Sequence, residues 1–193
     1  YLMNEGDMKA QYLLLTAAGF ILMLWMSWGL YVIYSTERPP YEVLQSLSAD
    51  VELRQYEAQT WISTTQETDH AAFPVLASYI FGGNKEGRQV SMTAPVITGA
   101  KMSFILPQEI SADNAPRPDG QAIDFSTVPA RKLATLEFAW WTDPVRVEQK
   151  TSELLDILQA NGVETTGRVF LMRYNDPWAP PFLRRNEVAI EAL

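Results

Sequence analysis

The pattern of hydrophobic and polar positions divides the chain into one long apolar segment and a longer region of alternating character. Residues 12–34 carry no charge. As a helix rising about 1.5 Å per residue, this segment would be roughly 35 Å long, enough to cross a hydrocarbon core of about 30 Å. A buried soluble helix is rarely uncharged over this length, and the apolar core of a signal peptide is shorter, about 7–15 residues. The pattern therefore predicts a retained transmembrane helix, with Tyr12 at one interface and Tyr31 and Tyr34 at the other.

Three further segments surround this predicted span. Residues 1–11 form a short polar tail, residues 35–40 form a linker, and residues 41–193 have the length of one ordinary domain. Pro39 and Pro40 stiffen the linker, because proline fixes its own φ and restricts the residue before it. We therefore expect the domain to be held close to the bilayer surface.

The flanks of the span leave its orientation nearly open. Lys9 stands on one side and Arg38 on the other, so the positive-inside rule does not decide between them. An uncleaved apolar segment near the N-terminus commonly acts as a signal anchor, which favours the periplasmic side for the domain. Small residues cluster at positions 17–19 and 27–29, and small residues allow helices to approach closely in lipid. We therefore expect that other transmembrane subunits of a larger complex can contact this helix.

Beyond residue 40 the pattern predicts strands interrupted by two helices. Alternation, or enrichment in aromatic and β-branched residues, predicts strands at 51–56, 61–65, 90–96, 102–106, 134–140, 169–174 and 187–190. A helical period predicts one helix near residues 70–82, capped by Thr68 or Asp69. Pro74 would give this helix a kink or a late start. A second helix is predicted over residues 144–160, so strand–helix–strand occurs twice, and this indicates an α+β duplication around one antiparallel sheet.

Composition disfavours several classes of function. The net charge is −8, which repels phosphate backbones and disfavours nucleic-acid binding. The chain has no cysteine, which removes disulfides, thiolate chemistry and cysteine-ligated metals. His70 is the only histidine, so no histidine cluster can hold a metal. In the first turn of the predicted helix, His70 is either a solvated residue or, as a neutral imidazole, an iron ligand or a partner for a ligand carboxylate.

Two stretches resemble functional motifs, but we interpret both of them as structural elements. Residues 81–87, FGGNKEG, look like a phosphate loop, but such a loop precedes a helix and this one follows the predicted helix. A helix C-cap and turn explain it better. Residues 176–188 are rich in proline, and within them Arg184, Arg185 and Glu187 can form an ion-pair set that pins the last strand. We favour this clasp over an acid–base role for Glu187, because a buried carboxylate beside arginine usually stays ionised and inert.

Five short motifs follow one another through the domain. They are YIFGGN at residues 79–84, MTAPV at 92–96, KMSFILP at 101–107, VPARK at 128–132 and PWAPPFLRRNEV at 177–188. In this order the motifs resemble the SOUL haem-binding protein family over roughly residues 41–191. The resemblance implies an α+β fold, a distorted antiparallel β-barrel of two pseudo-repeats with two flanking helices, related to bacterial small-molecule effector-binding domains. The N-terminal transmembrane helix is an addition to that plan.

The resemblance also indicates where a ligand would bind. Family members with an axial histidine carry it in the early strands, and residues 51–65 contain none here. Other members bind haem in an apolar groove along the first helix of the domain. In this chain the groove candidates on that helix are His70, Phe73, Leu76, Ala77 and Tyr79. His70 is the only candidate metal ligand.

Three functions follow from these observations. The first is a membrane-anchored, non-enzymatic binder of haem, another tetrapyrrole or another apolar small molecule. The second is an accessory subunit of a membrane protein complex, whose SOUL domain is a docking module with no bound haem. The third is a hydrolase of small apolar molecules that uses Tyr174 and Glu187, but it rests on fold analogy alone, which is a weak argument for function.

Overall fold

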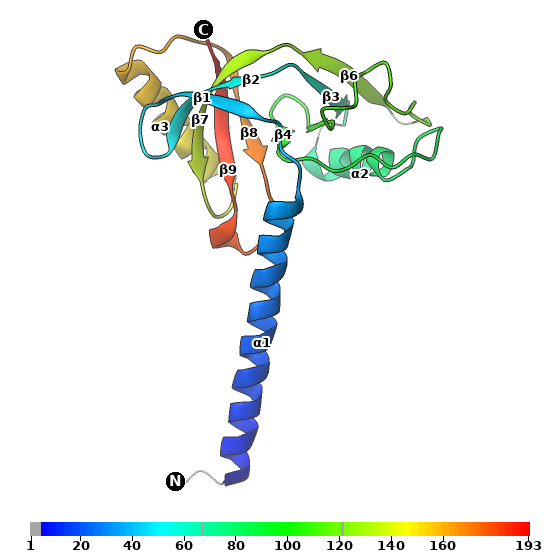
Figure 1. Cartoon of the computed structure of the whole chain (residues 1–193). Coiled ribbons are helices and arrows are strands. Elements are labelled where there is room, and N and C mark those ends of the chain that lie inside the picture. Colours follow the sequence, from blue (N-terminus) through cyan, green and yellow to red (C-terminus); the bar gives the residue numbers. More distant parts are fainter. Residues whose placement is uncertain (1–4, 67, 121) are drawn as a thin grey trace.

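The structure, a computed structural model, describes residues 5–66, 68–120 and 122–193. Helix α1 (Glu5–Ser35) extends away from a domain that sits at its C-terminal end (Figure 1). Residues 12–34 thus lie within one continuous helix, as expected. The helix starts earlier than the apolar segment because the preceding polar stretch, GDMKAQ, contains several good helix formers. Residues 1–4 of the expected polar tail lie outside the described residues.

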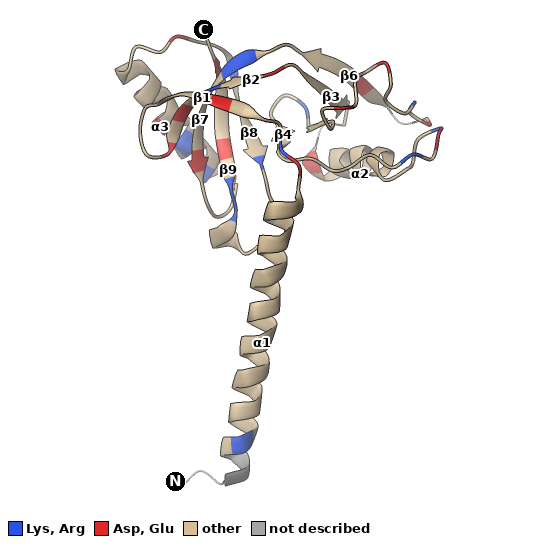
Figure 2. Cartoon of the chain, viewed as in Figure 1, with Lys and Arg blue, Asp and Glu red and all other residues tan. Residues whose placement is uncertain are grey.

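Within the described residues, α1 is the one helix with the length and composition to cross a membrane. Its apolar part is Met8–Val32, 25 residues with a mean hydropathy of 1.9, and 6% of its most apolar window is buried. A signal sequence can pass the same test of length and composition. Figure 2 shows that most charged residues lie in the domain and that the coloured part of α1 carries charge only near its N-terminal end.

Nine strands form one antiparallel sheet in the described part of the chain. They are β1 (Tyr41–Ser46), β2 (Val51–Tyr56), β3 (Gln59–Thr64), β4 (Val96–Thr98), β5 (Ser103–Ile105), β6 (Ile123–Val128), β7 (Arg131–Phe138), β8 (Thr165–Arg173) and β9 (Asn186–Ala192). Across the sheet their order is β1-β2-β7-β9-β8-β4-β5-β3-β6. Because no described pairing joins β1 to β6, the sheet is open, and the expected closure into a β-barrel is not confirmed.

The sheet has two halves with the same order of elements. In one half β3, α2 (Asp69–Ile80), β4 and β5 follow one another, and β5 lies between β3 and β4. In the other half β7, α3 (Pro144–Ala160), β8 and β9 follow one another, and β9 lies between β7 and β8. Pairing of β4 with β8 joins the halves. The predicted α+β fold with two strand–helix–strand units around one antiparallel sheet is therefore confirmed.

Side-chain caps set the start of both helices. The Thr68 hydroxyl accepts a hydrogen bond from the N–H of Ala71 at 3.3 Å, and the Asp143 carboxylate accepts one from the N–H of Arg146 at 3.0 Å. Thr68 is therefore the cap among the two candidates. The expected late start at Pro74 is wrong, because the cap already satisfies a donor of the first turn and α2 begins at Asp69.

Each helix packs an apolar face on its own half of the sheet. The first core contains Leu76 and Ile80 of α2 with Ile62 and Phe104 of the sheet. The second core contains two leucines of α3 and side chains of β2, β7 and β9. The two halves are unequal, because α2 buries five residues and α3 buries only Leu154 and Leu158.

The strand predicted over residues 90–96 is wrong except at its end. The N–H groups of Val90 and Ala94 donate to the carbonyls of Ile80 and Glu37, so they are not available to a neighbouring strand. Pro95 has no N–H to donate, and regular pairing therefore begins only at Val96, in β4. The sequence pattern also missed the edge strand β6.

The linker after α1 is attached to the domain. The N–H of Ala94 donates to the carbonyl of Glu37 at 2.9 Å, and Glu37 forms an isolated bridge with Thr93. The guanidinium of Arg38 lies 5.5 Å from the centre of the Tyr174 ring. These contacts fix the direction in which α1 leaves the domain.

Candidate functional site

A large cavity in the described part of the chain lies where α1, the start of α2 and the end of β8 meet. Its volume is about 710 Å³, within the range of roughly 300–1,000 Å³ that is usual for small-molecule sites. Its walls are mostly apolar and include Val32, Phe73, Met92, Val96, Met102 and Trp140. We call this space the α2 cavity. It is the candidate functional site because it combines this volume and these walls with a few polar side chains.

The α2 cavity contains two of the five groove residues that the sequence indicated. His70 and Phe73, on the first turns of α2, both line it. Phe73 is 42% exposed, and its ring packs edge-on against Phe104 with 5.5 Å between the ring centres. An aromatic wall and an accessible imidazole therefore lie on one side of the cavity.

The other three groove candidates lie in the core. Leu76 and Tyr79 are fully buried and Ala77 is almost so, and none of them lines the α2 cavity. The Tyr79 hydroxyl donates to the carbonyl of Pro116 at 2.6 Å, and burial raises the pKa of Tyr79. Helical spacing predicted that all five residues lie near one face of the helix. In the structure the first turns of α2 border the cavity, whereas its later turns pack on the sheet.

Two arginines from the second half of the chain also line the α2 cavity. Arg173, at the end of β8, forms an ion pair with Asp69 at the start of α2. The guanidinium of Arg184 lies 4.3 Å from the centre of the Trp141 ring. Sequence reasoning missed Arg173, because the pairing that brings the end of β8 to the start of α2 is set by the order of strands in the sheet. The cavity therefore offers cations beside its apolar walls.

A second group of chemistry-bearing residues surrounds a buried carboxylate beside the α2 cavity, and one of its members, Tyr174, also lines that cavity. Glu187 of β9 is completely buried, and its carboxylate accepts hydrogen bonds from Arg54 at 2.9 and 3.0 Å, from Arg185 at 2.9 Å and from the Tyr174 hydroxyl at 2.8 Å. We call these four residues the Glu187 cluster. Arg185 belongs to the predicted clasp. Arg184 does not, because it donates instead to nearby backbone carbonyls.

Burial and nearby charge shift the pKa values of Tyr174 and Arg54. Burial raises the pKa of Tyr174 well above its ordinary value, and the nearby Glu187 carboxylate acts in the same direction. Burial alone would lower the pKa of Arg54, but Glu187 and the Tyr56 hydroxyl outweigh it and the pKa is raised. Arg54 was missed by sequence reasoning. The sequence did contain a signal for it, because Arg54 is a charged residue on a strand whose end residues, Val51 and Tyr56, are buried.

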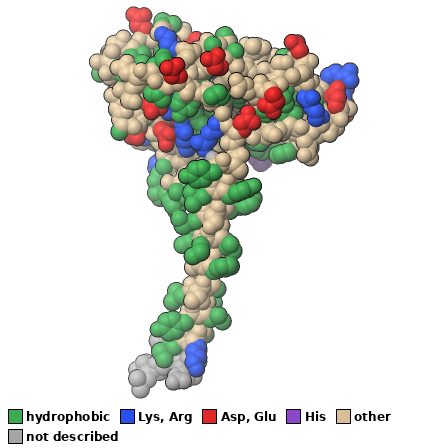
Figure 3. Space-filling view, viewed as in Figure 1, with side chains coloured by type: hydrophobic (Ala, Val, Ile, Leu, Met, Phe, Trp, Pro, Cys, Tyr) green, Lys and Arg blue, Asp and Glu red, His purple; other side chains and the backbone are tan. Residues whose placement is uncertain are grey.

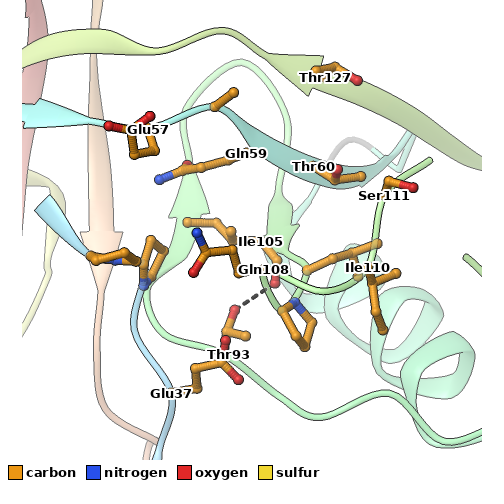
Figure 4. A pocket seen from close by; sticks show the side chains of 15 residues that line it. Glu37, Glu57, Gln59, Thr60, Thr93, Ile105, Gln108, Ile110, Ser111 and Thr127 are labelled. Carbon is orange, nitrogen blue, oxygen red and sulfur yellow. Dashed lines mark hydrogen bonds between the residues drawn. The ribbon is translucent and has the colours of Figure 1, made fainter. Parts of the chain in front are cut away.

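The smaller cavity, of about 240 Å³, lies between the linker and β3 (Figure 4). Glu37 and Glu57 are at its margin, and the Thr93 hydroxyl inside it donates to the carbonyl of Ile105 at 2.5 Å. Its volume is below the usual range for a small-molecule site, and it contains no arginine, lysine or histidine. We therefore place the candidate site in the α2 cavity.

The described residues contain no group of three His, Asp or Glu side chains that could hold a metal ion by themselves. A protein-only metal centre is thus not formed by this part of the chain. A macrocycle such as haem supplies most of the ligands of its own iron. The protein then needs to provide only one side chain, such as an imidazole, to complete the coordination. In the described part of the chain, His70 is the histidine that lines the α2 cavity.

The fold and the cavity define an α+β domain whose single antiparallel sheet carries one helix on each half. The chain belongs to the SOUL heme-binding protein family, because the model of that family matches residues 36–191. A search of curated proteins finds no match.

Solved structures show the same fold at low identity. The crystal structure of the EcmrR C-terminal domain is 14% identical, with a TM-score of 0.54, over 79% of this chain and 98% of that one. The crystal structure of a hydrolase from Listeria innocua is 12% identical, with a TM-score of 0.51, over 75% of this chain and 92% of that one. At these identities the likeness concerns the fold alone.

Proposed function

We propose that this chain is a membrane-anchored, non-enzymatic protein that binds haem or another tetrapyrrole in the α2 cavity. The observation that carries the proposal is the cavity itself, in which the only histidine, an aromatic wall and two arginines surround about 710 Å³. Membership of the SOUL family supports the choice of ligand.

The residues of the α2 cavity fit the chemistry of such a ligand. A tetrapyrrole is flat and apolar with carboxylate groups at its edge, so Phe73 and Met102 would contact its face and Arg173 and Arg184 its carboxylates. Burying a few hundred Å² of apolar surface at about 25 cal/mol/Å² supplies several kcal/mol of binding free energy without any bond to iron. When bound, haem would bring an iron centre, and His70 is the side chain that would hold it.

The anchoring part of the proposal rests on α1. An uncharged helix of this length that is left exposed to solvent would be costly, whereas lipid covers it favourably. The tyrosines near both of its ends support placement across a bilayer. We place the domain on the periplasmic side.

A second candidate, an accessory subunit of a membrane complex, is favoured by one observation on α1. The small-residue patch at positions 17–19 faces open space, and a Cβ added to Gly19 would meet nothing within 4 Å. Such a surface can accept another helix in lipid. Recovery of a lone monomer after extraction in gentle detergent would count against this candidate. The two candidates are compatible.

The proposed absence of catalysis is supported by the Glu187 cluster. A hydrolase that used Tyr174 and Glu187 would need a carboxylate free to take a proton. Glu187 instead accepts hydrogen bonds from two arginines and a tyrosine and is completely buried. Both of its oxygens are hydrogen-bonded within the domain rather than presented to a substrate. The matching order of elements in the two sheet halves also leads us to propose that they are pseudo-repeats.

Titration of the detergent-solubilised full chain with haem tests the proposal. We expect saturable quenching of tryptophan fluorescence and a shifted Soret band. The His70→Ala variant should change the position of that band if the imidazole binds iron, whereas Leu155→Ala on the outer side of α3 should not. Failure of the unsubstituted chain to quench or to shift the band would overturn haem binding.

A further inference from the structure

The proline-rich segment at residues 176–183 of the domain lies beside α1, at a part of the helix that precedes the C-terminal end of its apolar stretch. The indole N–H of Trp25 donates to the carbonyl of Trp178 at 2.7 Å, and a Cβ on Gly29 would stand 2.9 Å from the ring of Pro180. Trp25 precedes the end of the apolar stretch at Val32 by about two helical turns, which is roughly 10 Å at 1.5 Å per residue. A membrane that covers α1 would therefore also reach this segment.

The backbone of this segment is almost completely hydrogen-bonded within the protein. Every carbonyl from Asp176 to Pro181 accepts a hydrogen bond, three of them from the side chains of Trp25 and Arg184 and the others from backbone N–H groups. The prolines have no N–H to satisfy. This is the condition for placing non-helical backbone in a lipid environment, where water is not available as a partner.

Four aromatic side chains project from this part of the domain. Trp178 is 79% exposed and Phe182 48%, while on the adjacent turn Trp140 is 48% exposed and Trp141 53%. The turn is fixed to the segment, because the N–H of Trp140 donates to the carbonyl of Pro181 at 2.9 Å. We call these four side chains the aromatic foot. Residues 177–183 carry no charge, and the guanidinium of the flanking Arg184 donates to carbonyls of the segment.

Trp178 of the aromatic foot lies beside the aromatic residues of α1, because its carbonyl accepts the hydrogen bond from the Trp25 indole. Trp25 and Trp28 lie on the same part of the helix, and the rings of Trp28 and Tyr31 are 6.3 Å apart. Figure 3 shows hydrophobic side chains along α1 up to the underside of the domain. Tryptophan and tyrosine concentrate where hydrocarbon meets the headgroups. The foot and the helix together therefore have the composition of an interfacial belt.

We propose that the aromatic foot is inserted into the interfacial layer of the same bilayer that α1 crosses. This rests on the proposed anchoring by α1 and adds a second, monotopic contact with lipid. The domain would then be seated on the membrane at a fixed tilt. Trp140 and Pro177 line the α2 cavity as well, so one rim of the cavity would face the headgroup layer and admit an apolar ligand from the bilayer.

Spin labelling of the full chain tests the insertion. The chain has no cysteine, so each introduced cysteine is a unique labelling site. We would place a nitroxide at Trp141→Cys and Trp178→Cys in the foot, at Leu22→Cys in α1, and at Leu193→Cys, an exposed position at the chain end that lies away from α1 (Figure 1). Each protein is reconstituted in vesicles of phosphatidylcholine and phosphatidylglycerol. Collision of the label with oxygen, which concentrates in lipid, is compared with collision with a water-soluble nickel chelate.

At positions 22, 141 and 178 we expect oxygen collision to exceed nickel collision, with the reverse at position 193. If positions 141 and 178 behave like position 193 while position 22 reports lipid, the foot lies in water and only the insertion is overturned. If both reagents are excluded at positions 141 and 178, the foot packs against protein and the insertion is again overturned. If position 22 reports water, the anchoring by α1 fails too. Binding of haem is measured separately and does not depend on these outcomes.

Discussion

The Glu187 cluster and the α2 cavity contain the same kinds of side chain in opposite states. In the cluster, the carboxylate of Glu187 is completely buried and meets two guanidiniums and a phenol, and only the phenol, of Tyr174, belongs to a residue that also lines the cavity. In the cavity, Arg173 and His70 stand at the edge of about 710 Å³ of open volume. Charged residues in this domain stabilise the fold where all their hydrogen-bonding atoms have protein partners. They can bind a ligand where they border open volume.

The contrast follows from the sheet. Arg54 on β2 and Glu187 on β9 lie on strands that flank β7, so the sheet holds both side chains in its middle. The α2 cavity forms where the sheet ends, at the last residue of β8 and the first turns of α2. Interior positions are close-packed, whereas the ends of elements leave space that side chains only partly fill.

The largest effect is expected when the cluster is broken. Glu187→Ala leaves Arg54 buried, at 3% exposure, with only the partly exposed Glu52 as a carboxylate partner, and the loss of one partner of a buried ion pair costs about 3–5 kcal/mol in the free energy of unfolding. Thermal and urea unfolding of the full chain in detergent would measure it. Glu153→Ala is the matched control. It removes a carboxylate that pairs with Lys150 at the surface, where such pairs contribute about 0–1 kcal/mol. Equal stability losses in the two variants would contradict the comparison.

A smaller effect is expected from alkaline pH. Tyrosine in the unfolded chain has a pKa of about 10, whereas burial and Glu187 hold the pKa of Tyr174 well above that value in the folded chain. Below pH 10 the contribution of Tyr174 is fully present. As pH rises further, the unfolded state loses a proton that the folded state keeps, so stability falls by about 1.4 kcal/mol per pH unit for this group.

The slope of stability against pH isolates this contribution. Tyr174→Phe removes the titrating group and should make the alkaline fall less steep, as followed by urea unfolding at pH values on both sides of 10. The variant also loses the hydrogen bond to Glu187 and is therefore less stable at neutral pH. An unchanged slope would show that the phenol of Tyr174 does not stay neutral in the folded chain.

Local signals were sufficient for most of the fold. The apolar segment at residues 12–34, the cap at Thr68 and the helix at residues 144–160 each depend on neighbours in sequence, and all three agree with the structure. The strand at 90–96 failed because its N–H groups bond to Ile80 and Glu37, partners that no periodicity reveals. Closure of the sheet into a barrel is not confirmed, and local patterns could not decide it, since strand order depends on pairing between distant residues.

The site was predictable only in part. His70 and Phe73 could be found because they share one helix with an evident apolar stripe. Arg173 lies more than one hundred residues further along the chain and reaches the same cavity only through the pairing of β4 with β8. The aromatic foot was visible in sequence as a proline-rich stretch with Trp178, but its contact with Trp25 depends on how α1 leaves the domain.

The smallest effect is expected at the wall of the α2 cavity. Phe73→Ala removes part of the apolar surface that would contact a bound tetrapyrrole, and the loss of about 40 Å² at about 25 cal/mol/Å² corresponds to roughly 1 kcal/mol, or about a fivefold increase in Kd for haem. Leu155→Ala is the control, because Leu155 is similarly exposed, at 39% against 42%, but lies on α3 outside the cavity. Fluorescence titration of both variants measures Kd, and thermal unfolding checks that the packing of Phe73 on Phe104 is not the cause of the change. Equal Kd values for the two variants would place the ligand outside the α2 cavity. The cavity would then not differ from the Glu187 cluster in its ability to bind a ligand.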